Sequence, residues 1–297
     1  MSLIEFLRAE AGRDLSAIVD AVASTSLSVW RQIPLSTAYQ EGRNPSGDRQ
    51  MKIDLLANDA FVSSLLRTGV VAEVASEELE RPAVGEGHLH VAMDPLDGSS
   101  NVTTNNPLGS IFGVYSSGLP CSGRKMLAAI FVTYGPMLTL TFSLGGGVQR
   151  FTLVEQEGKR TFELHEGSIT LPSKEEVYGL GGLRKEWIPP VEKFVSSLEQ
   201  RGMKLRYGGT FVGDYNQVLR YGGIFGYPAL RAKPRGKLRI LYELAPMALI
   251  TEKAGGSASD GEVPLLSIEP SELAETSPGY LGNTSLVEEL LGLMSSG

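Results

Sequence analysis

The sequence predicts a mixed α/β protein whose two halves pack as one compact unit. Helix-periodic apolar residues alternate with short apolar runs that are typical of strands. Two of these runs, residues 70–75 and 89–93, each lead into acidic side chains. Four more runs between residues 126 and 164 are separated by Gly and Pro turns, which is typical of an antiparallel meander. A chain of 297 residues is long enough for one large domain or for two packed halves.

The predicted elements of the N-terminal half follow in chain order. Apolar residues at helical spacing predict a helix from residue 2 to about residue 29, with a break near Gly12. Residues 33–50 are polar and rich in Gly, Pro and Ser, so they predict a loop. A second helix follows, with Asp54 as its expected N-cap and Gly69 at its end.

The C-terminal half also alternates between helices and strands. Pro189 and Pro190 predict the start of a helix that ends near Gly202. Further along, the pattern predicts strands or tight crossings over residues 204–207, 221–225 and 238–242, and helices over residues 212–220, 243–254 and 284–293. No long hydrophilic linker interrupts the chain, so we expect two packed halves, residues 1–172 and 173–297.

The charge balance of the chain limits its partners. Lys and Arg total 27 against 34 Asp and Glu, which gives a formal net charge of −7. The overall charge of the chain therefore provides no long-range electrostatic attraction to nucleic acid or to an anionic membrane. Any phosphate must therefore be held by a local site.

Cys121 is the only cysteine, which excludes an intrachain disulfide and favours a reducing compartment. Residues 1–20 fit neither a signal nor a transit peptide, and no apolar run approaches the roughly 18 residues of a membrane span, so a cytoplasmic location is expected.

The most informative stretch is Asp94-Pro-Leu-Asp-Gly-Ser-Ser-Asn101, which follows an apolar run. Asp94 and Asp97 place two carboxylates at the end of the predicted strand, and carboxylates suit a hard cation that prefers oxygen ligands. The backbone N–H groups of Gly98, Ser99 and Ser100 can form a concavity that suits an anion such as phosphate. The alternative is a loop that only turns the chain. The whole octapeptide favours a metal and phosphate site.

A second acidic pair follows the preceding predicted strand. Ser76-Glu77-Glu78 follows residues 70–75, and only 16 positions separate Glu78 from Asp94. Two adjacent glutamates are otherwise an ordinary solvated charge pair. If the two strands are neighbours, both acidic groups lie at one edge of one sheet, which favours a functional role.

Basic and aromatic side chains collect in the C-terminal half, close in sequence to Glu243. Lys and Arg bind phosphate strongly, and tyrosine hydroxyls add neutral donors. In an acidic protein these residues are candidates for a second anion site, although singly they are typical of surface charges and core aromatics. The candidates are Arg206, Tyr207, Tyr227, Lys237 and Arg239.

The octapeptide resembles the signature of the magnesium-dependent sugar phosphatases, and further segments resemble the class I fructose-1,6-bisphosphatase family in order. These segments are Gly47-Asp48…Lys52-Ile53-Asp54, Ser76-Glu77-Glu78, Leu205-Arg206-Tyr207, Tyr221-Gly-Gly-Ile-Phe…Tyr227-Pro228 and Lys237-Leu-Arg-Ile-Leu-Tyr-Glu243. The resemblance extends from about residue 40 to the end of the chain. It implies an α+β, or α/β, sugar-phosphatase fold with alternating α-β-α-β-α layers.

Within that family, Gly182-Leu183-Arg184 is similar to the corresponding segment of the sedoheptulose-1,7-bisphosphatase branch, where fructose-bisphosphatases place an Asn-Glu-Gly-Tyr loop. The resemblance therefore implies hydrolysis of the C1 phosphate of sedoheptulose 1,7-bisphosphate. Fructose 1,6-bisphosphate is the second candidate substrate. A family member that has lost activity and serves as a regulatory binding protein is a third possibility.

The resemblance also implies roles for individual residues. Two or three Mg²⁺ ions, or Mn²⁺ in their place, would be held by Glu77, Asp94, the Leu96 carbonyl, Asp97 and Glu243. Glu78, supported by Asp54, would take a proton from the attacking water, and Asp48, the third candidate catalytic residue, would assist at the metal ions. Substrate would be bound by Gly98, Ser99, Ser100, Arg184, Arg206, Tyr207, the segment from Gly209 through Thr210 to Phe211, Tyr227, Lys237 and Arg239. One arginine of the distal phosphate site comes from a neighbouring subunit in fructose-bisphosphatases, so a homo-oligomer, a dimer or tetramer, is expected.

Overall fold

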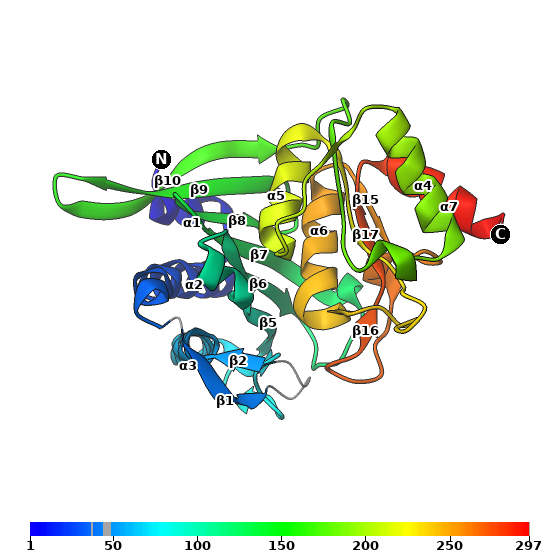
Figure 1. Cartoon of the computed structure of the whole chain (residues 1–297). Helices are drawn as coiled ribbons and strands as arrows, with labels where there is room; N and C mark the ends of the chain where they lie inside the picture. The colour runs from blue at the N-terminus through cyan, green and yellow to red at the C-terminus, as the bar shows by residue number, and fades with distance from the viewer. Residues whose placement is uncertain (37, 44–48, 297) are drawn as a thin grey trace.

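The computed structural model describes residues 1–36, 38–43 and 49–296 and arranges them in alternating layers of helix and sheet (Figure 1). Helices α1–α3 cover one face of an eight-stranded sheet, and α5 and α6 lie between that sheet and a five-stranded sheet. Helices α4 and α7 cover the outer face of the smaller sheet. The predicted α-β-α-β-α layering is confirmed.

The N-terminal helices agree with the periodicity of their sequences. The predicted break at Gly12 divides α1 (Leu3–Glu10) from α2 (Arg13–Gln32). Helix α3 (Lys52–Arg67) begins before Asp54, so the prediction of Asp54 as N-cap is wrong: Asp54 lies in the first turn and accepts the N–H of Met51 at 2.6 Å. The predicted loop over residues 33–50 contains a small strand pair, β1 (Tyr39–Arg43) and β2 (Arg49–Met51), which the Gly-rich composition concealed.

The eight-stranded sheet places the acidic strand ends next to each other. β3 (Val71–Ser76) pairs in parallel with β5 (Leu89–Asp97), which confirms that the two strands are neighbours. The remaining strands run antiparallel, and the predicted meander forms β7 to β10. They are β4 (Ala83–Val84), β6 (Leu108–Tyr115), β7 (Met126–Tyr134), β8 (Leu138–Ser143), β9 (Val148–Gln156) and β10 (Lys159–Ile169).

The five-stranded sheet has the order β12-β11-β13-β17-β15. Its strands are β11 (Val177–Leu180), β12 (Lys204–Leu205), β13 (Gly223–Tyr227), β15 (Ser257–Ser259) and β17 (Gly279–Gly282), and a separate pair is formed by β14 (Leu238–Arg239) and β16 (Thr276–Ser277). The helices are α4 (Pro189–Gln200), α5 (Phe211–Tyr221), α6 (Ala245–Lys253) and α7 (Thr284–Ser295). The predicted division at residue 172 falls between β10 and β11 and stays a prediction about domains.

One predicted strand is mostly helical. Only Leu238–Arg239 is extended, and the chain then enters a π-helical turn, Ile240–Leu244, that leads into α6. All five residues of this turn are buried, so their continuous apolar character does not distinguish a strand from a buried helix. The turn carries Glu243 inward, and π-helical turns often occur at functional sites.

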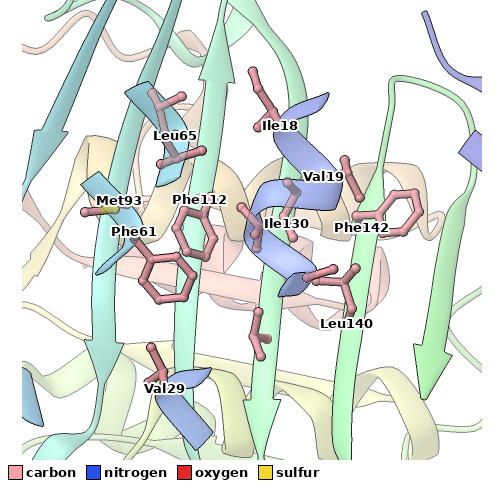
Figure 2. Packing of buried hydrophobic residues seen from close by; sticks show 14 of the residues in the cluster. Ile18, Val19, Val29, Phe61, Leu65, Met93, Phe112, Ile130, Leu140 and Phe142 are labelled. Atoms are coloured by element: carbon pink, nitrogen blue, oxygen red, sulfur yellow. The ribbon is translucent and has the colours of Figure 1, made fainter. Parts of the chain in front are cut away.

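The core has two layers because successive residues of a strand face opposite sides of the sheet. On β7, Ile130 faces α2 and α3, whereas Phe131 faces α5 and α6. Figure 2 shows the first layer, where Phe61 of α3 packs edge-on against Phe112 of β6 at 4.8 Å between ring centroids. Such packing stabilises the sheet whose strand ends form the site. Within the described part of the chain, no helix is both long and apolar enough to cross a bilayer.

Candidate active site

A cavity of about 370 Å³ lies where the ends of β3 and β5 meet the start of α5 and the π-helical turn. Most of the predicted site residues line it, although they come from segments far apart in the chain. The lining residues are Asp54, Glu77, Glu78, Asp94, Leu96, Asp97, Gly98, Ser99, Ser100, Tyr207, Gly209, Thr210, Phe211, Asp214, Phe225, Tyr227, Lys237, Leu238, Arg239 and Glu243.

Four carboxylates form the acidic end of this cavity. Asp94, Asp97 and Glu243 are buried, and Glu77 is 11% exposed. Burial raises the pKa of Asp94 well above its ordinary value, and the charges of Glu77, Asp97 and Glu243 raise it further. Burial also raises the pKa of Asp97, to about 7, and that of Glu243. The four groups therefore repel one another in a place that water screens poorly.

Asp97 is fixed by the start of α5. Its two carboxylate oxygens accept the N–H groups of Phe211 at 3.1 Å and Val212 at 2.7 Å. The N-terminus of a helix favours a negative charge because its first N–H groups have no partners within the helix. Close packing of the Gly98 turn against the helix supports this contact: a Cβ on Gly98 would lie 2.1 Å from Thr210 Cγ2, and its φ of +73° favours glycine.

Arg239 supplies a positive charge inside the acidic end. Its Nη2 lies 2.9 Å from Glu77 Oε1, and its Nη1 lies 3.7 Å from Glu243 Oε2. Its backbone N–H also donates to Glu243 Oε2 at 2.7 Å. One buried guanidinium therefore opposes part of the charge of four carboxylates and leaves the acidic end with an excess of negative charge.

The acidic end fits a hard divalent cation by its chemistry. It offers carboxylate oxygens, and a cation would relieve their mutual repulsion. Within the described residues, no three acidic, histidine or cysteine side chains already surround one point as a finished metal cage.

Asp54 and Glu78 form a second acidic pair beside the turn Gly98-Ser99-Ser100, which we call the phosphate turn after its predicted role. Burial raises the pKa of Asp54 to about 7, the hydrogen bond from Met51 opposes this shift, and the charge of Glu78 adds to it. A carboxylate that titrates near neutral pH can accept or donate a proton under ordinary conditions. Ser99 and Ser100 lie at the same wall of the cavity.

Other lining residues present neutral and cationic donors: Tyr207, Tyr227 and Lys237, which we call the distal end of the cavity. Burial raises the pKa of Tyr207 to about 12, so this residue stays a neutral phenol. Lys237 Nζ lies 5.9 Å from the centroid of the Tyr227 ring. Phe211 stacks on Phe225 of β13 with 4.4 Å between ring centroids, and this contact packs the start of α5 against the five-stranded sheet. This end can bind an anion through Lys237 and the two hydroxyls.

Two predicted substrate residues do not reach the cavity of this chain. Arg184 pairs instead with Glu192 at 2.9 Å and Glu199 at 3.0 Å on α4, and it lies 5.9 Å from the Trp187 ring centroid. Arg206 is exposed and donates to the Leu205 carbonyl at 3.2 Å. Asp48 lies outside the described residues.

Three lining residues were absent from the predicted site: Asp214, Phe225 and Leu238. The sequence contains a signal for Asp214, which stands in the first turn of a helix directly after Gly208-Gly209-Thr210. Phe225 and Leu238 are apolar residues of predicted strands, so their position in the wall depends on the tertiary fold alone.

The layers and the acidic pocket between them place the chain in the layered sugar-phosphatase fold class. Residues 15–165 match the family described as fructose-1-6-bisphosphatase, N-terminal domain, and residues 171–295 match the C-terminal domain of the same description. The chain belongs to the class 1 fructose-1,6-bisphosphatase family.

Individual relatives agree over nearly the whole chain. The chain is 44% identical to a fructose-1,6-bisphosphatase class 1 of Natronomonas pharaonis, over 92% of this chain and 96% of the relative. It is 43% identical to one of Haloarcula marismortui, over 95% of each. The crystal structure of Leishmania major fructose-1,6-bisphosphatase in holo form superposes with a TM-score of 0.94 at 30% identity and covers 99% of both chains.

Proposed function

We propose that this protein is a Mg²⁺-dependent phosphatase that removes the C1 phosphate of fructose 1,6-bisphosphate. The observation that carries the proposal is the lining of one cavity, which brings together buried carboxylates, a Gly-Ser-Ser turn, and the donors Tyr207, Tyr227 and Lys237. A sugar with a phosphate at each end matches this arrangement. The names of the relatives support the same substrate.

The acidic end would hold the metal. Mg²⁺, when bound, supplies positive charge that stabilises the leaving oxygen and lowers the pKa of water, and Mn²⁺ can take its place. Its protein ligands would be Glu77, Asp94, the Leu96 carbonyl, Asp97 and Glu243. Arg239 would balance Glu77 and Glu243, to which it is already paired.

The neighbouring residues would position the reacting groups. The backbone N–H groups of Gly98, Ser99 and Ser100 would bind the transferred phosphoryl oxygens. Glu78 would accept the proton of the attacking water, and Asp54, whose pKa is about 7, would share that proton. Asp48 is proposed to assist from the segment that precedes α3. Positioning and charge neutralisation are the main requirements of phosphoryl transfer.

Two observations move the substrate proposal from the seven-carbon sugar to fructose. The preference for sedoheptulose 1,7-bisphosphate gave Arg184 the main role in binding the far phosphate, and this side chain is held by two glutamates of α4 rather than in the cavity. The relatives named above are fructose-1,6-bisphosphatases. We therefore propose fructose 1,6-bisphosphate as the preferred substrate and an active enzyme rather than a regulatory binding protein.

We also propose a cytoplasmic homo-oligomer, a dimer or tetramer. Arg206 follows β12, the edge strand of the five-stranded sheet, and Leu205 beside it is 56% exposed. An exposed edge with an apolar side chain is typical of a contact surface. From such an edge, Arg206 could reach the distal phosphate in the cavity of a second subunit.

The proposal is tested by measuring phosphate release with Mg²⁺ from three compounds in parallel: fructose 1,6-bisphosphate, sedoheptulose 1,7-bisphosphate and fructose 6-phosphate. We expect the largest kcat/KM for fructose 1,6-bisphosphate, with fructose 6-phosphate as the product and no further release from it. A larger kcat/KM for the seven-carbon substrate would reverse the substrate proposal. No release from either bisphosphate would contradict the proposed activity itself.

A further inference from the structure

The buried carboxylate of Asp214 lines the same cavity as Tyr207 and Lys237, although the proposed mechanism gives it no role. This side chain is 6% exposed and belongs to the first turn of α5. A carboxylate in direct contact with a substrate phosphate would repel it. Its presence in the wall of an anion site therefore requires another explanation.

Both oxygens of Asp214 are already engaged by the backbone of the preceding loop. Oδ1 accepts the N–H of Gly208 at 2.5 Å, and Oδ2 accepts the N–H of Gly209 at 3.0 Å. The φ of Gly209 is +87°, a conformation that only glycine adopts readily. The carboxylate thus fixes a flexible Gly-Gly step in one conformation.

The same loop is held from its other side by Asn101, which follows the phosphate turn. Asn101 Nδ2 donates to the Gly208 carbonyl at 2.9 Å and to the Pro107 carbonyl at 3.4 Å. The N–H and the carbonyl of Gly208 are therefore bound by two elements, α5 and the phosphate turn. Beyond the loop, the Thr210 hydroxyl caps α5 by accepting the N–H of Gly213 at 2.9 Å.

We propose that Asp214 is a positioning residue for sugar-phosphate recognition: it orders the Gly208–Gly209 step and so places Tyr207 and Phe211 on the two sides of the substrate. This inference rests on the proposed function, because it takes the ligand between Tyr207 and Phe211 to be a sugar bisphosphate. Asp214 acts through the loop rather than by touching the reacting atoms. Its loss therefore affects substrate binding more than the chemical step.

The decisive variant is Asp214→Asn, which keeps the shape of the side chain but turns an NH₂ group toward one backbone N–H. We expect KM for fructose 1,6-bisphosphate to rise about tenfold while kcat stays within about twofold. Hydrogen exchange at the amides of Gly208 and Gly209 should become at least about tenfold faster. A purely structural role would instead lower kcat and thermal stability together.

The chain offers a matched control in Asp260, whose Oδ1 accepts the N–H groups of Glu262 and Val263, each at 2.7 Å, in a surface loop away from the cavity. Asp260→Asn should leave KM unchanged. Asn101→Ala removes the hydrogen bond from Asn101 Nδ2 to the Gly208 carbonyl and should raise KM about threefold. If Asp214→Asn fails to fold, the variant of the half-buried Asn101 decides: a raised KM supports the inference, and an unchanged KM overturns it.

The outcomes separate this inference from the proposed function. If the wild-type protein hydrolyses fructose 1,6-bisphosphate and Asp214→Asn has an unchanged KM, the inference alone is overturned. If the wild-type protein hydrolyses no sugar bisphosphate, the proposed function fails, and the recognition role of Asp214 fails with it. A raised KM together with faster exchange at Gly208 and Gly209 supports both.

Discussion

The two ends of the cavity are built in different ways. At the acidic end, Asp94 and Asp97 extend from a central strand, are buried, and have pKa values raised mainly by that burial. At the distal end, Tyr207 is 45% exposed and Lys237 is exposed, and both belong to loops of the C-terminal half. The acidic end is thus buried, whereas Tyr207 and Lys237 leave the distal end partly open to water.

This difference assigns separate tasks to the two ends. Buried charges act strongly on a reacting group because little water screens them. Exposed donors contribute less energy individually but can select the length of a sugar by their distance from the reacting phosphate. Substitutions at the acidic end should therefore reduce kcat, and substitutions at the distal end should raise KM.

The largest effect is expected from Asp97→Asn at the acidic end. The substitution removes a negative charge from the proposed metal site and weakens the contact with the N-terminus of α5. We expect kcat for phosphate release to fall at least about 10³-fold, as for loss of a group that acts in the transition state. Asp20→Asn, on the exposed surface of α2, serves as the control. Retention of a tenth of the activity would contradict the role assigned to Asp97.

A smaller effect is expected from Lys237→Met at the distal end. The variant removes the ammonium beside Tyr227, so KM for fructose 1,6-bisphosphate should rise about 10- to 100-fold, with kcat changed by less than about threefold. Lys233→Met, an exposed lysine of the same loop, provides the matched control. Equal losses of kcat in the two lysine variants would show that the two ends are not separable.

A modest effect concerns the stability of the metal-free protein. Asp54 and Asp97 have folded-state pKa values of about 7 against 3.8 as the ordinary value, and Asp214 has one of about 6. Since these groups hold protons more tightly when folded, their contribution is fully present below pH 3.8 and is lost as the pH rises through 6 to 7.

The Tm of the metal-free protein should therefore fall by on the order of 5 °C between pH 5.5 and 8, as followed by circular dichroism. Added Mg²⁺ should raise Tm more at pH 8 than at pH 5.5, because deprotonated carboxylates bind the cation. A Tm that rises with pH in the absence of metal would show that these groups are not buried together.

The smallest effect is expected from Arg184→Ala. Its guanidinium is held by Glu192 and Glu199 outside the cavity, in exposed ion pairs of the kind that contribute about 0–1 kcal/mol. The values of kcat/KM for fructose and sedoheptulose bisphosphate should both stay within about twofold of wild type. A selective loss of kcat/KM for sedoheptulose 1,7-bisphosphate would show that Arg184 takes part in binding that substrate.

The sequence was most informative where one short segment contains both the chemistry and its backbone support. The octapeptide from Asp94 to Asn101 follows a strand directly, so its carboxylates and turn could be predicted together. Arg184 was misleading because a motif does not reveal that α4 supplies two glutamates to pair with it. Asp214 was missed although it stands in the first turn of a helix after a Gly-Gly-Thr step, because its partners are backbone N–H groups and no charged or nucleophilic side chain lies next to it in the sequence.

The central claim is that the buried carboxylates form a metal-dependent phosphatase centre, and its most direct test is phosphate release from fructose 1,6-bisphosphate after chelation. Protein treated with EDTA and freed of chelator should release no phosphate, and titration with Mg²⁺ should restore release. In Asp94→Asn, the same titration should restore almost none. Full turnover of the wild-type protein in excess EDTA would contradict the claim.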